Sequence, residues 1–301
     1  MMNKVLVLGG TQYFGKKLVQ KLIDHGDEVT IATRGTKDEP FGEKVNRLVI
    51  DREKKETLAE ALKGKEWDLV YDQSCFSPIE ARDTTELLNG RVARYIFTST
   101  QAVYEFGTLH KEEDFNAFTY SINYKGRREY PGYEGYKEAK RASEAVFHQL
   151  GQFETISSRF PIVVSEDDYT ERLKFHVDKI LSGEAIGIPQ PEMRYSFIEA
   201  DEAADFLMNI GKSDYTGPIN PGSAGDISLQ ELIDKIELLT GKEAIVDKNP
   251  HSDNMSPYAL PGSWSIDTSR AAALGYRFTG LHRLLDTLIK KYIMAYGKIS
   301  E

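Results

Sequence analysis

The chain has 301 residues, enough for one large domain or two smaller ones. Its 40% hydrophobic and 28% charged residues are typical of a globular protein with a sizeable core. The formal net charge of −9 argues against a nucleic-acid-binding protein, because phosphate contacts need clustered Lys and Arg.

Cysteine and histidine usage narrows the possible chemistry further. The single cysteine, Cys75, cannot form an internal disulfide, which favours a reducing compartment. No apolar run has the length of a signal peptide or a membrane span, so we expect a cytoplasmic protein. The six histidines lack metal-ligand spacing, and no metal site is expected.

The first half of the chain alternates apolar runs with helical patterns. Lys4–Leu8 reads as a buried strand, and the helical spacing of apolar residues after it ends near His25 and Gly26. Further strands are predicted at 29–32, 47–50, 68–71 and 95–98, with a helix at 57–63. This alternation predicts an α/β fold of the Rossmann type, a doubly wound parallel sheet whose ligands bind at the carboxyl ends of the strands.

The second half is less regular. A helix at 136–150 and a strand at 155–158 continue the alternation, and helices follow at 171–181, 199–210 and 228–239. We therefore expect residues 1–165 to form a dinucleotide-binding domain to which elements near 196–210 return. Residues 166–301 are expected to form a smaller C-terminal substrate-binding lobe.

A glycine-containing loop follows the first strand. A pyrophosphate must approach backbone N–H groups closely, which residues without a side chain permit. Gly9 allows the turn and Gly15 allows the helix to pack near the strand, but Gln12 stands where the middle glycine of the usual pattern would be. The residues of this loop predicted to bind the cofactor are Gly9, Thr11, Gln12, Tyr13, Phe14 and Gly15.

The end of the second strand bears on the choice between NAD and NADP. An acidic residue there usually accepts hydrogen bonds from the adenosine ribose of NAD, but this chain has Thr33 followed by Arg34. A guanidinium suits a 2′-phosphate, so NADP is slightly favoured. Asp51, after the third strand, either accepts a hydrogen bond from the adenine amino group or caps a helix.

Tyr136 and Lys140 are the strongest catalytic signal. On a helix, their spacing of four residues places both side chains on one face. The ammonium would favour the phenolate, so that Tyr136 could exchange a proton with a substrate hydroxyl near neutral pH while Lys140 also holds the cofactor ribose. Thr100, at a strand end, either hydrogen-bonds the reacting oxygen or caps local backbone.

These motifs occur in the order seen in extended short-chain dehydrogenase/reductases. The glycine loop, Thr100, the Tyr136/Lys140 pair and the stretch from Ser158 to Pro161 carry the resemblance, which extends over nearly the whole chain. The chain most resembles the NAD-dependent epimerase/dehydratase group. Its Gly-Gly-Thr-x-x-Phe-Gly start is also similar to an atypical branch that includes chloroplast stem-loop-binding proteins.

The resemblance implies a catalytic set of Thr100, Tyr136 and Lys140, with Pro161 near the cofactor. Family dehydratases follow the catalytic Thr with Asp-Glu, and decarboxylases keep the Glu, whereas this chain has Gln101 and Ala102. Dehydration is therefore disfavoured, and a nucleotide-sugar 4-epimerase-like enzyme with transient hydride transfer is expected.

Two other functions stay open. An NADPH-dependent reductase of a small carbonyl compound is suggested by Arg34, and a non-catalytic dinucleotide-sensing or RNA-associated protein by the variant glycine loop. Arg194 either binds a substrate phosphate or forms a structural salt bridge. By analogy with the family, helices around 83–89 and 136–150 could form a homodimer interface.

Overall fold

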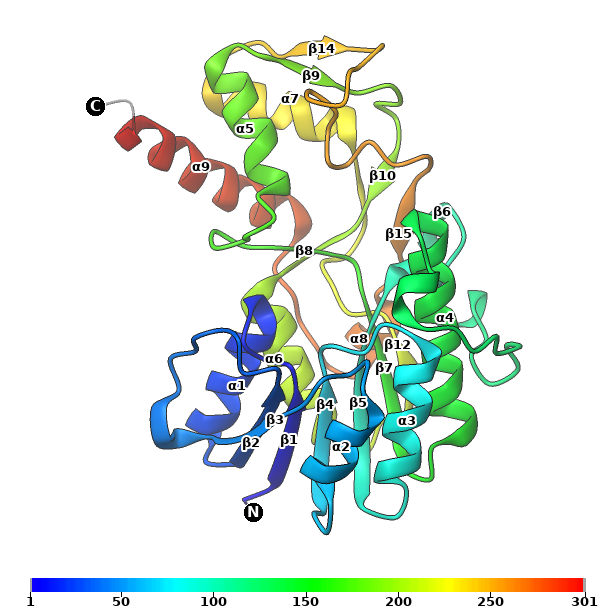
Figure 1. The fold of residues 1–301 in the computed structure, drawn as a ribbon. Helices are drawn as coiled ribbons and strands as arrows, with labels where there is room; N and C mark the ends of the chain where they lie inside the picture. Colours follow the sequence, from blue (N-terminus) through cyan, green and yellow to red (C-terminus); the bar gives the residue numbers. More distant parts are fainter. Residues whose placement is uncertain (1, 300–301) are drawn as a thin grey trace. The chain divides into compact units, whose positions relative to one another are not determined.

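Two units make up the chain over residues 2–299, the part that the computed structural model describes (Figure 1). Unit 1 contains the residues up to Tyr104, Glu112–Phe160 and Ala200–Pro221. Unit 2 contains Glu105–Lys111, Pro161–Glu199 and the residues from Gly222 onward. Both units are therefore discontinuous in the sequence.

Unit 1 is built on a parallel sheet of seven strands in the order β12-β7-β5-β4-β1-β2-β3. The strands are β1 (Lys4–Leu8), β2 (Glu28–Thr33), β3 (Asn46–Val49), β4 (Trp67–Asp72), β5 (Val92–Thr100), β7 (Glu154–Phe160) and β12 (Gly217–Ile219). The helices are α1 (Tyr13–His25), α2 (Lys55–Leu62), α3 (Pro78–Leu88), α4 (Gly132–Leu150) and α6 (Ala200–Gly211). The predicted Rossmann-type doubly wound fold is confirmed.

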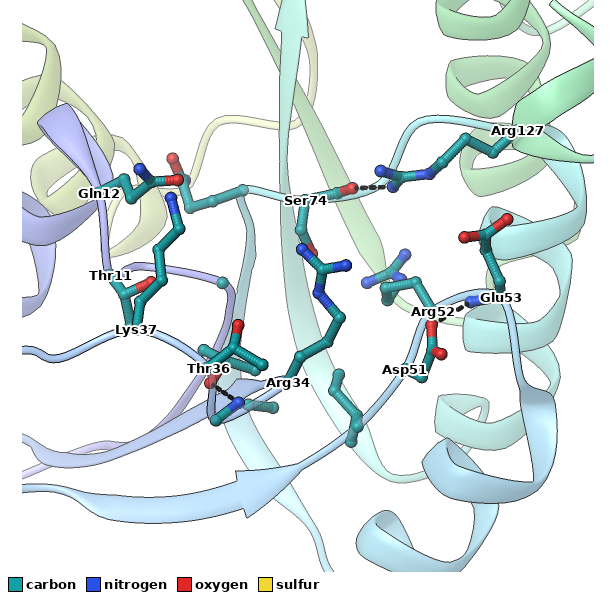
Figure 2. A pocket seen from close by; sticks show the side chains of 16 residues that line it. Thr11, Gln12, Arg34, Thr36, Lys37, Asp51, Arg52, Glu53, Ser74 and Arg127 are labelled. Carbon is teal, nitrogen blue, oxygen red and sulfur yellow. Dashed lines mark hydrogen bonds between the residues drawn. The ribbon is translucent and has the colours of Figure 1, made fainter. Parts of the chain in front are cut away.

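The strand order reverses direction between β1 and β4, since β2 and β3 lie on one side of β1 and β5 and β7 lie on the other side of β4. In open α/β sheets, ligands bind at the carboxyl ends of the strands beside such a reversal. Most of the residues shown in Figure 2 gather at this place, at or after the ends of β1, β2, β3 and β4. The sheet thus positions the candidate site.

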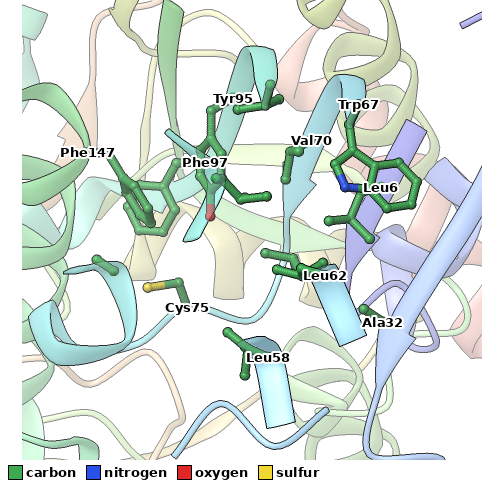
Figure 3. Close-up of a cluster of buried hydrophobic side chains, with 14 of the residues drawn as sticks. Leu6, Ala32, Leu58, Leu62, Trp67, Val70, Cys75, Tyr95, Phe97 and Phe147 are labelled. Carbon is green, nitrogen blue, oxygen red and sulfur yellow. The ribbon is translucent and has the colours of Figure 1, made fainter. Parts of the chain in front are cut away.

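The two faces of the sheet are covered by different helices. Helices α1 and α6 pack against each other, and α2, α3 and α4 pack in a row on the other side. Successive residues of a strand point to opposite faces. Leu6 and Leu8 of β1 accordingly join the core beneath α2, α3 and α4, where Leu58, Leu88 and Phe147 are buried (Figure 3).

Local sequence signals explain where several helices begin and end. Helix α1 ends at Gly26, whose φ of 88° is the left-handed conformation that glycine adopts readily. Helix α3 begins after Ser77, which accepts a hydrogen bond from the Glu80 amide and is followed by Pro78 in the first turn. These capping residues satisfy helix-terminal groups that would otherwise lack partners.

Unit 2 combines short strands with three longer helices. Its sheets are β13-β10-β15-β6, β11-β8 and β14-β9, made of β6 (Gly107–His110), β8 (Ile162–Val164), β9 (Ala185–Gly187), β10 (Arg194–Tyr195), β11 (Phe197–Glu199), β13 (Ile227–Ser228), β14 (Ile245–Asp247) and β15 (Trp264–Ile266). Its helices are α5 (Arg172–Ser182), α7 (Leu229–Thr240), α8 (Ser269–Ala273) and α9 (Leu281–Ile299). Helices α5, α7 and α9 pack against one another.

Over residues 2–299, no helix combines the length and the apolar composition needed to cross a bilayer.

Candidate active site

The glycine loop between β1 and α1 requires its glycines for two different reasons. Gly9 and Gly10 have φ values of 97° and 83°, and a Cβ on Gly10 would lie 2.7 Å from Val7 Cγ1. A Cβ on Gly15, in the first turn of α1, would lie 3.3 Å from the Gly10 Cα. The loop thus turns sharply and keeps its backbone close to the start of the helix, as a pyrophosphate site requires.

Gln12 is the N-cap of α1, with extended backbone and no side-chain cap hydrogen bond. Its side chain lines the adjacent cavity together with Gly9 and Thr11. Tyr13 begins the helix with a φ of 50°, and the Phe14 ring packs 5.5 Å from that of Phe160. The structure therefore brings Gly9, Thr11 and Gln12 to the cavity, while Tyr13, Phe14 and Gly15 shape the turn behind it.

A cavity of about 370 Å³ lies at the carboxyl ends of β1 to β4 (Figure 2). It is lined by Gly9, Thr11, Gln12, Ala32, Thr33, Arg34, Gly35, Thr36, Lys37, Ile50, Asp51, Arg52, Glu53, Gln73, Ser74 and Arg127. Its volume is within the range of ordinary ligand sites. The glycine loop singled out from the sequence thus lines a cavity large enough for part of a dinucleotide.

Arg34 and Asp51 both line this cavity. Arg34 is exposed, as is Lys37 beside it in the loop after β2. The Asp51 carboxylate accepts a hydrogen bond from the Glu53 amide at 3.1 Å, whereas helix α2 has Lys54 as its N-cap. Asp51 is therefore not the cap of α2, and its carboxylate lies in the cavity wall.

Tyr136 and Lys140 both lie on α4, one turn apart. Lys140 is buried, and its Nζ donates hydrogen bonds to the carbonyl oxygens of Cys75 at 3.1 Å and Thr98 at 2.9 Å. Tyr136 is 36% exposed, and its ring lies 5.8 Å from that of Phe76. The lysine is thus held by backbone at the ends of β4 and β5, while the tyrosine keeps an accessible surface.

Burial lowers the pKa of Lys140 to about 8, although neighbouring charges oppose this effect. Between pH 8 and 10.5, the folded chain therefore holds fewer protons at this position than the unfolded chain. Because the unfolded state binds more protons, raising the pH through this window favours folding.

We accordingly expect the free energy of unfolding of the wild type to rise from pH 8 to pH 10.5 relative to a Lys140→Met variant. The difference should reach at most ~3 kcal/mol. Urea unfolding of both proteins at several pH values measures it. Parallel stability curves for the two proteins would contradict a lowered Lys140 pKa.

Thr100 ends β5, and its Oγ1 accepts a hydrogen bond from the Ala102 amide at 3.2 Å. The backbone-capping alternative considered from the sequence is thus realised. The following residues, Gln101 and Ala102, are buried at 4% and 2% exposure. Neither side chain can act as the acid or base that water elimination needs.

Arg159, from the stretch that resembles the family, holds unit 1 together beneath this site. It is fully buried and donates to Glu144 on α4 at 3.0 Å through Nε and at 2.5 Å through Nη2. The Tyr104 hydroxyl and two backbone carbonyls accept its other hydrogen bonds. The residue links β7 to the helix that carries Tyr136 and Lys140.

Arg194 and Pro161 belong to unit 2. Arg194 forms ion pairs with Asp226 at 2.7 Å and Glu231 at 3.1 Å, so the salt-bridge alternative is present in the structure. A substrate phosphate would have to compete with both carboxylates. Cofactor contact by Pro161 and phosphate contact by Arg194 stay predictions.

Several residues of the cavity were not singled out from the sequence. Gln73 and Ser74 follow β4, and Arg52 follows Asp51 after β3. Their positions directly after strands could have identified them by the rule that found Arg34 and Asp51. Arg127 comes from the long segment before α4, where no periodic pattern predicts which residue reaches the cavity.

Over residues 2–299, no group of three or more His, Cys, Asp or Glu side chains is arranged to hold a metal ion.

Several known proteins are similar to this chain in sequence or in structure. The model of the NAD dependent epimerase/dehydratase family matches residues 5–218. UDP-glucuronic acid decarboxylase 5 of Arabidopsis thaliana is 25% identical over 268 residues, covering 78% of this chain and 74% of the relative. The chloroplast stem-loop binding protein of 41 kDa b from the same plant is 30% identical over 127 residues, 37% of this chain and 33% of that protein.

Among solved structures, the UDP-glucose 4-epimerase of Thermus thermophilus, crystallised with NAD, has a similar fold. Its TM-score is 0.68 at 18% identity, over 96% of this chain and 98% of the epimerase. The family match spans β1, the glycine loop, the cavity, Tyr136 and Lys140, and continues into β12. The chain belongs to the NAD-dependent epimerase/dehydratase family.

Proposed function

We propose that the chain is an NAD(P)-dependent enzyme that epimerises a nucleotide sugar at a ring carbon through transient hydride transfer. The observation that carries this proposal is the fixed position of Lys140, bound to the carbonyls of Cys75 and Thr98 at the strand ends, one helical turn from Tyr136. The dinucleotide cavity lies along the same edge of the sheet.

The residues present fit a dinucleotide, because the closely packed turn at Gly10 and Gly15 leaves no room for side chains. Gly9, Thr11 and Gln12 would contact the pyrophosphate, and Arg34 and Asp51 the adenosine half. Lys140 would hold the nicotinamide ribose. When bound, the nicotinamide supplies a reversible acceptor for hydride.

Tyr136 would carry the proton chemistry. Its phenolate oxygen would take the proton of the sugar hydroxyl at the reacting carbon and would return it once the configuration at that carbon has changed. The Lys140 ammonium favours the phenolate electrostatically. Thr100 would orient the reacting oxygen through its hydroxyl.

Gln101 and Ala102 favour epimerisation over reactions that need a further acid or base. The Arabidopsis relative is a UDP-glucuronic acid decarboxylase, so decarboxylation is the reaction to compare with. Product analysis with UDP-glucose and UDP-glucuronic acid distinguishes the possibilities. Formation of an epimer with no net change in NAD(P)H is expected, whereas release of carbon dioxide as the main reaction would contradict the proposal.

Two alternative functions are each favoured by a different observation, and each would give a different experimental result. The exposed Arg34 favours an NADPH-dependent carbonyl reductase, which would consume NADPH in proportion to product. The partial match to the stem-loop binding protein favours an RNA-associated protein. Tight RNA binding with bound dinucleotide and no turnover on any sugar nucleotide would favour that alternative, although the net charge of −9 opposes it.

Arg34 also gives a testable cofactor preference. We expect the wild type to bind NADPH more tightly than NADH, because a guanidinium can contact the 2′-phosphate bidentately. Arg34→Ala should weaken NADPH binding by about tenfold or more, ~1.5–3 kcal/mol for a hydrogen bond to a charged group, and change NADH binding much less. Titration of both nucleotides against both proteins measures this. Equal losses for the two nucleotides would show that Arg34 does not read the 2′-phosphate.

A further inference from the structure

Side chains hold the backbone of the segment Ser74–Phe76, which lies shortly after β4 in unit 1. Each amide and each carbonyl of these residues has a side-chain partner, as buried backbone groups require. The amides donate to Asp72 from Ser74 at 3.0 Å and from Cys75 at 2.9 Å, and to Glu80 from Phe76 at 3.1 Å. The carbonyls accept from Arg127 at Ser74 (2.9 Å), from Lys140 at Cys75 (3.1 Å) and from Ser143 at Phe76 (3.2 Å).

The residues of this segment face different parts of the candidate site. Ser74 lines the cavity. The Cys75 carbonyl is one of the two acceptors that hold the Lys140 ammonium. The Phe76 ring lies 5.8 Å from the ring of Tyr136. The segment therefore connects the cavity wall to both members of the proposed catalytic pair.

An ion pair between Arg127 and Glu80 fixes both ends of the segment. The Glu80 carboxylate is buried on α3 and accepts from Arg127 Nε at 2.7 Å and Nη2 at 2.9 Å. The same carboxylate accepts from the Phe76 amide, and the same guanidinium donates to the Ser74 carbonyl (Figure 2). Arg127 also lies 5.3 Å from the centre of the Phe76 ring. Paired hydrogen bonds between charged groups are strong, so the segment is held firmly.

We propose that Arg127 and Glu80 are positioning residues for catalysis. Their ion pair holds the segment Ser74–Phe76 against Tyr136 and Lys140. A misplacement of about 1 Å can lower turnover about 10²-fold, so a small shift of this segment would affect the reaction even where the cavity stays intact. This inference rests on the proposed function, because it presupposes that Tyr136 and Lys140 carry out the reaction.

Cys75 provides a measurement that needs neither dinucleotide nor substrate. It is the single cysteine of the chain, lies in the middle of the segment and is buried. Burial raises the pKa of its thiol to about 12. An aromatic disulfide reagent such as DTNB should therefore react only with molecules in which the segment has opened. The reaction rate of the dinucleotide-free protein measures how firmly the segment is held.

Two conservative variants weaken the ion pair from opposite sides. Arg127→Lys keeps the charge but loses the paired hydrogen bonds, and Glu80→Gln keeps the size but loses the charge. We expect each to raise the thiol reaction rate about tenfold, because a hydrogen bond between charged groups is lost. Turnover per bound dinucleotide, of whichever of UDP-glucose and UDP-glucuronic acid the wild type accepts, should fall by about the same factor. The KM for that substrate and the Kd for NADPH should stay close to the wild-type values.

Arg128→Lys is the matched control. Arg128 is the neighbour of Arg127, pairs with Glu53 at 3.0 Å, is 85% exposed in its side chain and takes no part in the hydrogen bonds of the segment described above. This variant should resemble the wild type in thiol reaction and turnover. Arg127→Lys combined with Glu80→Gln should be no worse than the poorer single variant, because both changes break the same pair. If Glu80→Gln does not fold, Arg127→Lys still tests the inference, since the Arg127 side chain is 39% exposed.

The possible results separate this inference from the proposed function. A thiol reaction as slow in both variants as in the wild type would overturn the inference, because the ion pair would not hold the segment. A faster thiol reaction with unchanged turnover would also overturn it and leave the pair a structural role. Weaker NADPH binding in Arg127→Lys alone would show instead that Arg127 contacts the ligand. A wild type that turns over neither sugar nucleotide would overturn the proposed function, and the catalytic role of the pair with it, whatever the thiol reaction shows.

Discussion

Replacing Tyr136 by Phe is expected to lower turnover of the accepted sugar nucleotide by a factor of about 10²–10⁴, the usual contribution of a positioned acid or base. The change removes the hydroxyl that exchanges the proton and keeps the ring that lies against Phe76. Binding of NAD(P)H should change little, because Lys140 and the glycine loop are untouched. Steady-state kinetics together with nucleotide titration measures both effects.

Tyr124→Phe is a matched control for this experiment. Tyr124 is 40% exposed, close to the 36% of Tyr136, and belongs to the same unit but to the segment before α4. Tyr124→Phe removes a hydroxyl that has no proposed role in proton transfer, so turnover by this variant should be close to that of the wild type. If Tyr136→Phe were as active as this control on every accepted substrate, Tyr136 would not be the proton-transfer residue.

The largest expected effect on stability is at Glu144. Glu144→Ala would leave Arg159 buried without a counter-charge and would remove the acceptor that Ser99 contacts at 2.7 Å. Breaking a buried ion pair from one side costs ~3–5 kcal/mol. Urea unfolding should show a loss of this size.

Glu53→Ala provides the comparison, because Glu53 forms an exposed ion pair with Arg128. The side chain of Glu53 is 37% exposed and that of Arg128 is 85% exposed. An exposed pair contributes ~0–1 kcal/mol. A loss for Glu144→Ala as small as that for Glu53→Ala would mean that Arg159 is not held by charge pairing.

The elements near the N-terminus are well predicted because their signals are local. The apolar run Lys4–Leu8 coincides with β1, and the periodic residues before Gly26 coincide with α1. In contrast, β12 (Gly217–Ile219) was not predicted, since it is three residues long and contains Pro218. Proline is tolerated there because β12 is at the edge of the sheet and pairs only with β7 among residues 2–299.

The candidate site shows the same division between local and non-local information. Tyr136 and Lys140 are found from the sequence because helical spacing places them together. Arg52 could not be recognised as a buried residue, because its burial depends on Asp72, 20 positions further along the chain. A pairing of this kind exists only after β3 and β4 have taken their places in the sheet.

The late position of β12 has a consequence for synthesis on the ribosome. Strand β7 ends at Phe160, but the strand that covers its outer edge ends at Ile219, roughly 60 residues later. At about 5–20 residues per second, this edge stays without its partner for roughly 3–12 s. During that interval the nascent chain offers a row of unpaired backbone groups to other chains, a period in which protection by a chaperone would matter most.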